Sequence, residues 1–241
     1  MSFDSVRAFR FVGSALALAA LGAAAPVAAE ETAGDCMGFD FDAGRPAVIS
    51  RVDGAAAKAL FVRSAWENAA CPADTAACRG RAYLVPGDLV LTGKVNGVYT
   101  CVAFQALNDR KQIWTNGWIA SARLAPVAPA SATQSSDWTG TWRHTGGEIT
   151  IKPAKGGKLS IAGEHTYPVA GSVRTGDFAA EVAPAGGLLA FVDGGDKPFD
   201  KAAEDECQVR MQRVGAILVV EDNGTCGGAM VTFTGLYQRK R

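Results

Sequence analysis

The sequence has few of the residues that usually carry out catalysis or bind metal ions. It contains only two histidines, His144 and His165, and it has no Gly-x-Ser-x-Gly sequence to present a nucleophilic serine. Cys71 and Cys78 have no second cysteine pair at zinc-finger spacing. We therefore expect a protein that is not an enzyme and that holds no metal and no cofactor. Both histidines are interpreted as imidazoles at the surface or on an edge strand.

The sequence also lacks an excess of positive or negative charge. Lysine and arginine together number 24, aspartate and glutamate also number 24, and no run of basic residues occurs. A nucleic-acid-binding protein needs a basic patch, and a protein that binds a membrane surface needs a basic amphipathic face. We therefore expect no nucleic-acid partner and no membrane-surface partner.

The first 29 residues have the pattern of a signal peptide. Arg7 and Arg10 precede an apolar run over residues 11–25, and small residues end at Ala29. No twin-arginine pair precedes the run, and no cysteine directly follows it to accept a lipid. The sequence predicts cleavage after Ala29. The mature chain is expected to be periplasmic or secreted, without membrane insertion.

Six cysteines follow this segment, and an even count in an exported chain favours disulfides over metal binding. If pairing stays within domains, Cys207 pairs with Cys226, and the remaining four allow three connectivities. We favour Cys71–Cys78 as a local loop and Cys36–Cys101 as a tie between the N-terminal arm and a strand. The six are Cys36, Cys71, Cys78, Cys101, Cys207 and Cys226.

The chain divides into two predicted modules. Residues 125–137 are rich in Ala, Pro and Ser, have no apolar period, and are interpreted as a linker. The first module is residues 30–124, and the second is residues 138–241. Both contain short β-rich runs separated by Gly-containing turns, with no convincing helix. The predicted fold class is therefore all-β, with a small N-terminal barrel and a C-terminal antiparallel barrel or sandwich of about eight strands.

The first module has strand patterns at residues 45–52, 82–85, 89–92, 98–104 and 112–119. Residues 57–68 fit either a strand or a helical turn. The turn at Pro86-Gly87-Asp88, the Asn96-Gly97 hairpin and Gly117-Trp118-Ile119 lie among these runs. With Arg123-Leu124, these motifs resemble a bacterial Src-homology-3-like domain over about residues 45–126. Such domains hold peptides in aromatic-lined grooves. This resemblance makes Tyr83, Tyr99, Trp114 and Trp118 candidate ligand-binding residues, although Trp118 also fits a core position.

The second module opens with Trp138-Thr-Gly-Thr-Trp142, which resembles the opening of lipocalin-like barrels, where the tryptophan closes one end. Further strands are predicted at residues 148–152, 158–162, 167–170, 177–183 and 188–192. A final three-stranded meander over residues 207–237 follows from the alternation of Cys207, Val209 and Met211 with polar residues. In this prediction Cys207 lies opposite Asp222, Asn223-Gly224 makes the next turn, and Val231, Phe233 and Tyr237 form the last strand.

These patterns predict an exported, non-enzymatic binding protein that recognises a cell-envelope component or a protein partner. One alternative is a carrier whose barrel encloses a small apolar ligand. A related one is an inhibitor of a secreted hydrolase such as lysozyme. A hydrolase that uses His144 or His165 is the least favoured reading, because no nucleophile–base pair is evident. The sequence leaves the oligomeric state open.

Overall fold

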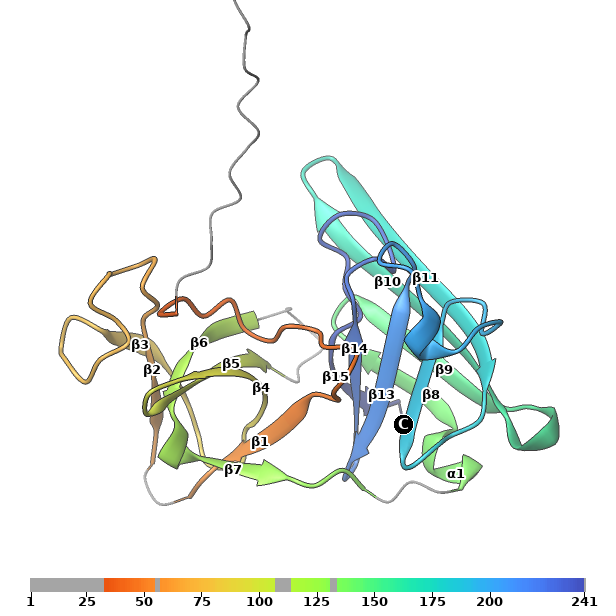
Figure 1. The fold of residues 1–241 in the computed structure, drawn as a ribbon, viewed down its shortest axis with the longest axis horizontal. Helices are drawn as coiled ribbons and strands as arrows, with labels where there is room; N and C mark the ends of the chain where they lie inside the picture. Colours follow the sequence, from red (N-terminus) through yellow and green to blue (C-terminus); the bar gives the residue numbers. More distant parts are fainter. Residues whose placement is uncertain (1–32, 55–56, 107–113, 131–133, 241) are drawn as a thin grey trace, which may run out of the picture. The chain divides into compact units, whose positions relative to one another are not determined.

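A computed structural model describes residues 33–54, 57–106, 114–130 and 134–240 of the chain (Figure 1). The predicted signal peptide and its cleavage site at Ala29 lie outside these residues. The described chain is all-β, as predicted, and its strands form one seven-stranded and one eight-stranded antiparallel sheet. No helix among these residues has the length and apolarity needed to cross a membrane.

The first sheet has the strand order β3-β2-β6-β5-β4-β1-β7. Its interior holds an apolar cluster that includes Phe61, Leu84, Val102 and Ile119. The Asn96-Gly97 hairpin joins β4 to β5 as predicted, with Gly97 at a φ of 58°. The strands are β1 (Val48–Val52), β2 (Ala59–Val62), β3 (Arg79–Leu84), β4 (Leu89–Asn96), β5 (Tyr99–Gln105), β6 (Trp114–Ala120) and β7 (Leu124–Val127).

The predicted linker begins as a strand and ends as a helical turn. β7 pairs with β1, so the chain up to Val127 belongs to the first sheet. A short helix, α1 (Ser135–Trp138), then leads into the second sheet. The Ala/Pro/Ser composition did not reveal this pairing, because a short edge strand needs no apolar alternation of its own.

The second sheet is a nearly closed barrel in which each strand pairs with its neighbour in sequence, except that β11 and β12 form the two edges of the sheet. The last strand, β15, also pairs with the first, β8. Two hydrogen bonds join the residues that follow β12 to β11. Gly194 N donates to Ala179 O (2.7 Å), and Ala179 N donates to Asp193 Oδ1 (2.8 Å). The strands are β8 (Gly140–His144), β9 (Gly147–Pro153), β10 (Leu159–Val169), β11 (Ser172–Val182), β12 (Leu188–Val192), β13 (Gln208–Val214), β14 (Ile217–Asp222) and β15 (Gly235–Arg239).

Side chains fill the interior of this barrel. Trp138 and Trp142 are both fully buried, and Trp142 Nε1 donates a hydrogen bond to Trp138 O (2.8 Å). The interior cluster continues through Ile149, Phe178 and Met211 to Phe233. The alternation of apolar and polar residues along each strand therefore produces a packed core.

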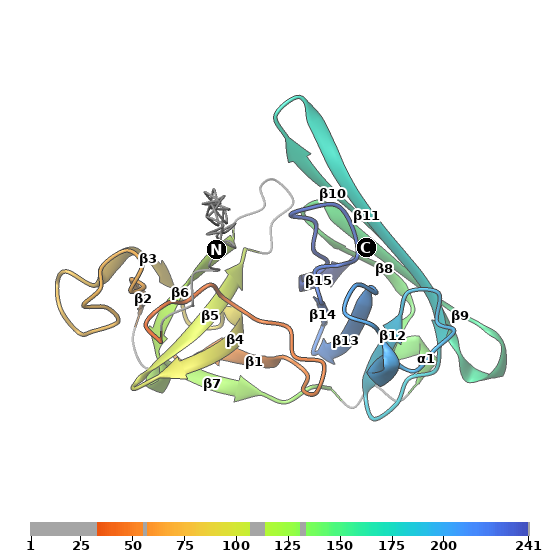
Figure 2. The same ribbon diagram turned by 45° about the horizontal axis from the view of Figure 1, so that its top comes forward.

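Two details of the second sheet differ from the prediction. β10 and β11 form one long hairpin of 11-residue strands, where we expected separate shorter strands (Figures 1 and 2). Val209, and not Cys207, lies opposite Asp222. The shift arises because Gly215, at a φ of 57°, makes a two-residue turn that pairs Val214 with Ile217.

The third strand of the predicted meander is also shorter than expected. Only Gly235–Arg239 is a strand, and residues 223–234 form a loop that covers one end of the barrel. We name this loop the plug. Val231 and Phe233 alternate as predicted and are buried, because they pack inward from the plug.

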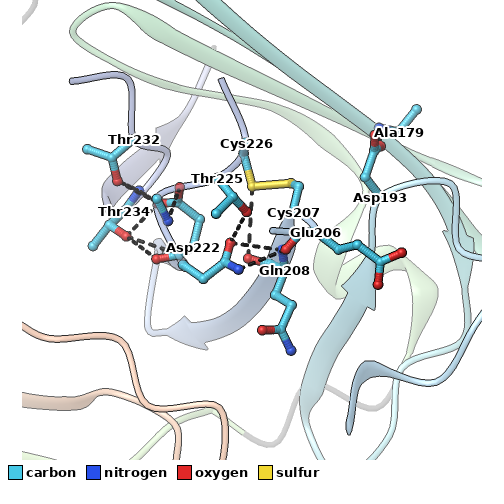
Figure 3. Close-up of a disulfide and its surroundings, with 12 residues drawn as sticks. Ala179, Asp193, Glu206, Cys207, Gln208, Asp222, Thr225, Cys226, Thr232 and Thr234 are labelled. Atoms are coloured by element: carbon cyan, nitrogen blue, oxygen red, sulfur yellow. Dashed lines mark hydrogen bonds between the residues drawn. A yellow bond between two sulfur atoms is a disulfide. The ribbon is translucent and has the colours of Figure 1, made fainter. Parts of the chain in front are cut away.

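Three disulfides join all six cysteines in the favoured pattern, and the prediction is confirmed. The pairs are Cys36–Cys101, Cys71–Cys78 and Cys207–Cys226. The last of these ties the plug to the residue that precedes β13 (Figure 3). A chain with no free cysteine and three disulfides suits an oxidising compartment outside the cytoplasm.

The two sheets share an apolar cluster formed by their outward-facing residues. Ile49 on β1 and Leu91 on β4 pack with Val219 on β14 and Leu236 on β15, and all four are buried. Gln212 Nε2 adds a hydrogen bond to Ala47 O (2.7 Å). The described chain therefore has an apolar core shared by the two sheets, in addition to the clusters within each sheet.

Candidate functional site

The structure does not bring the four predicted aromatic residues together on one surface. Tyr99 and Trp118 are buried beside the Cys36–Cys101 disulfide, and Trp118 Nε1 donates to Gly34 O (2.9 Å). Tyr83 lies on the edge strand β3 and is 46% exposed, with the Lys58 ammonium 3.9 Å from its ring centroid. Only Trp114 lines a hollow in the described surface. The described structure therefore does not place all four side chains in a single groove.

Trp114 belongs to a groove of about 370 Å³, a volume typical of small-ligand sites. One wall is a segment that we name the strap, residues 37–42, which runs between the first disulfide and β1. We call the hollow the strap groove. Its lining residues are Met37, Phe39, Asp40, Phe41, Ala103, Trp114, Asn116, Asp222, Asn223, Gly224, Thr232 and Thr234.

The strap is fixed at both of its ends. The Cys36–Cys101 disulfide holds its start, and Asn116 Nδ2 donates to Met37 O (2.7 Å). Gly38 has a φ of 104°, and a side chain there would lie within 2.8 Å of the Asn116 amide. Glycine is therefore required where the strap passes close to β6.

At its other end the strap is held by a buried ion pair of the second sheet. Arg210 Nη2 bonds Glu221 Oε2 at 2.8 Å and also donates to Asp42 O (2.7 Å). Glu221 Oε1 accepts from Ala47 N (2.8 Å). The Arg210 guanidinium lies 5.5 Å from the Phe41 ring centroid. A paired buried arginine with these extra acceptors holds the aromatic wall in position.

The opposite wall of the groove is built around the Asp222 carboxylate (Figure 3). Oδ1 accepts from Thr232 Oγ1 (2.5 Å), Thr234 N (2.8 Å) and Thr234 Oγ1 (2.7 Å). Oδ2 accepts from Gly224 N (3.2 Å). These bonds fix the start and end of the plug against the end of β14. The wall is therefore preorganised.

Sequence reasoning missed the phenylalanines of the strap. The signal was present as the alternation Phe39-Asp40-Phe41-Asp42, in which two aromatic residues interleave with two acids. It was overlooked because the segment precedes the first predicted strand and carries none of the motifs that mark the first module.

His165 is inside the second barrel, which corrects the expectation of a surface or edge-strand position, whereas His144 is half-buried and lines a hollow at the surface. His165 is only 2% exposed, and its strand neighbours in register are Gly147 and Gly176, which leave room for the imidazole. The His144 and His165 ring centroids are 5.3 Å apart. Their alternation on the inward face of β8 and β10 places them in the core beneath the plug.

Gln105 determines the tautomer of His144. Gln105 Oε1 accepts from Leu236 N (2.9 Å), which leaves the amide Nε2 as a donor toward His144 Nδ1 (2.9 Å). Nδ1 must then be unprotonated, and the proton of the neutral ring is on Nε2. A metal bound at Nε2 would require a proton on Nδ1, where it would face the Gln105 donor. This geometry disfavours metal coordination by His144.

The electrostatics of the histidines also argue against acid–base chemistry near neutral pH. Burial, with a smaller contribution from the nearby His165, lowers the pKa of His144 to about 3. Burial likewise lowers the pKa of His165, partly opposed by the charge of Asp222. A general base works best when its pKa is near the working pH. Among the described residues, no group of three or more His, Cys, Asp or Glu side chains could hold a metal ion.

The strap groove is therefore the candidate ligand site, and the histidine pair is part of the barrel core. No family model, curated protein or solved structure matches this chain.

Proposed function

We propose that the chain is an exported, non-enzymatic binding protein that recognises a cell-envelope component or a protein partner through the strap groove. The observation that carries this proposal is the groove itself, which combines three aromatic side chains with a rigid polar wall. Binding sites of this kind are largely preformed and have few, well-placed polar groups. The N-terminal pattern of a signal peptide supports export, and the three disulfides agree with it.

Other features support binding over the alternatives. A carrier needs an enclosed cavity, but the described interior of the second barrel is filled by its own side chains. An enzyme needs a nucleophile or base in an accessible site, whereas His165 is buried, His144 is half-buried, and burial lowers the pKa of both imidazoles. The resemblance of the first module to Src-homology-3-like domains favours a peptide-containing ligand.

The test is a retention assay on purified cell-wall sacculi with the mature chain from Glu30. We expect the wild-type protein to be retained and the Trp114→Ala variant to lose most of its retention, because the variant removes one aromatic wall of the groove. Trp66→Ala is the matched control, since Trp66 is 69% exposed and lies outside the groove. Equal loss in both variants would point to a general surface effect, and retention unchanged by Trp114→Ala would remove the groove from the proposal.

A further inference from the structure

We infer that the strap groove selects a positively charged ligand: an organic ammonium group attached to an apolar body. This inference rests on the proposed function, because it names the chemistry of the ligand for the same site. It is carried by the charges and the aromatic side chains around the groove.

The charged residues that line the groove are all acidic. Asp40 and Asp222 are among the described lining residues, and none of these is Lys, Arg or His. Asp40 is exposed and lies between the two phenylalanines of the strap. A cleft lined by one sign of charge concentrates ligands of the opposite sign.

The Asp222 carboxylate lines the groove although it is only 4% exposed. The donors to its carboxylate are two threonine hydroxyls and two backbone N–H groups, all of which are neutral. None of these four donors carries a positive charge. A buried carboxylate surrounded only by neutral donors makes the groove wall electronegative.

The buried Arg210 behind the aromatic wall does not reverse this sign. The Arg210 guanidinium lies behind Phe41, 5.5 Å from its ring centroid, and is paired with the fully buried Glu221 at 2.8 Å. The pair contributes no net charge. The net charge of the described side chains that line the groove is therefore negative.

The aromatic wall suits the same ligand. Phe39, Phe41 and Trp114 each remain partly exposed, and none of the described residues that line the groove with them is basic. The faces of aromatic rings attract ammonium groups, and tryptophan does so most strongly. An anionic ligand would meet two carboxylates and the negative faces of these rings, so we expect it to be excluded.

The experiment compares three probes that share a phenyl body: phenethylamine, 2-phenylethanol and phenylacetate. Binding to the mature disulfide-bonded protein is followed by the chemical shifts of the Trp114 indole and of the strap amides. We expect phenethylamine to bind about 5-fold more tightly than 2-phenylethanol, with phenylacetate weakest. Asp40→Asn should reduce the preference for the amine over the alcohol. The control Asp177→Asn removes the same charge from the outer face of β11 and should leave the preference unchanged.

The possible outcomes separate the inference from the proposed function. If none of the probes shifts the groove resonances, the groove is not a ligand site, and both proposals fail together. If 2-phenylethanol or phenylacetate binds as tightly as phenethylamine, the groove remains a site but the charge selection is overturned. An equal effect of Asp40→Asn and Asp177→Asn would also overturn it, because the preference would then reflect only net charge.

Discussion

Two buried polar side chains, Gln105 and Arg210, each join segments that lie far apart in the sequence. Gln105 comes from β5 and bonds both His144 and Leu236 of the second sheet. Arg210 comes from β13 and bonds the strap. A buried donor left without a partner costs about 1–3 kcal/mol. Each residue therefore specifies one arrangement of the segments that it joins.

His144 makes the stability of the fold depend on pH. Its pKa falls from the ordinary 6.5 to about 3 on folding, so the unfolded chain binds the proton more readily. Stability is then greatest above pH 6.5 and decreases as the pH falls toward 3. We expect a loss of about 2 kcal/mol between pH 6.5 and 5 from this imidazole, measured by urea unfolding at a series of pH values.

The variant His144→Gln separates this effect from other acid effects. It should make the stability profile less steep between pH 6.5 and 5, even if the variant is less stable at neutral pH, and the slope that remains comes from His165, whose pKa burial also lowers. Glu206 and Asp42 also have lowered pKa values, through bonds to Lys197 and Arg45 respectively, but their ordinary values of 4.5 and 3.8 place their influence at lower pH. A profile equally steep in the variant would show that the imidazole is not the cause.

The plug is the element whose structure depends most on a covalent link. Besides the Cys207–Cys226 disulfide, Gly228 N donates to Thr175 O (3.1 Å) and Arg174 Nη1 to Ala229 O (2.8 Å). Residues 223–234 have no pairing partner along most of their length, so few backbone bonds hold them. Loops with few such bonds open locally at low free-energy cost.

Replacing both Cys207 and Cys226 by Ser should release the plug. We expect the amides of Gly228 and Val231 to exchange with solvent much faster, and the unfolding free energy to fall by about 3 kcal/mol for this loop length. Hydrogen exchange of the oxidised protein and the variant provides the measurement. The matched control replaces Cys71 and Cys78 by Ser, since that disulfide lies in the first module. Plug amides that exchange at the same rate in all three proteins would contradict this role.

Local sequence patterns predicted most of the strands. The features that were not predicted, the plug and the strap groove, depend on contacts between residues far apart in the sequence. Leu188–Val192 and the Asn96-Gly97 hairpin follow from residues adjacent in sequence, and both were predicted. The plug differs because Val231 and Phe233 are buried by β10 and β11, which lie far away in the chain. Alternation predicts which side chains face inward but not whether the backbone finds a strand partner. The strap groove was missed for the same reason, since it combines residues from three separate segments.

At the scale of the whole described chain, the sequence indicated two modules but not the core between them. The outward residues of β14, Ile217 and Val219, are apolar, whereas an isolated barrel would place polar residues there. The run from Ile217 to Val220 contains this information, because a strand with both faces buried is continuously apolar. On the partner surface, Leu89 to Leu91 of β4 form a shorter run of the same kind, but neither run identifies the other as its partner, so the contact could not be predicted.

Val219→Asp tests whether the two sheets unfold together. The variant places a carboxylate among Ile49, Leu91 and Leu236, and burying an unpaired charge costs several kcal/mol. We expect two separate heat-capacity peaks by calorimetry where the wild type shows one. Val95→Asp is the control, because Val95 is exposed and should tolerate the change. A single unshifted transition in Val219→Asp would show that the shared core does not couple the sheets.

The shared core also limits how the protein can be divided in the laboratory. A fragment that ends near residue 130 would leave Ile49, Leu91 and Ala103 in water, and the complementary fragment would expose Val214, Val219 and Leu236. Contiguous apolar surface of this kind promotes aggregation. Recombinant production of either half is therefore expected to give insoluble material, and chimeras that exchange one barrel for another would need this surface redesigned.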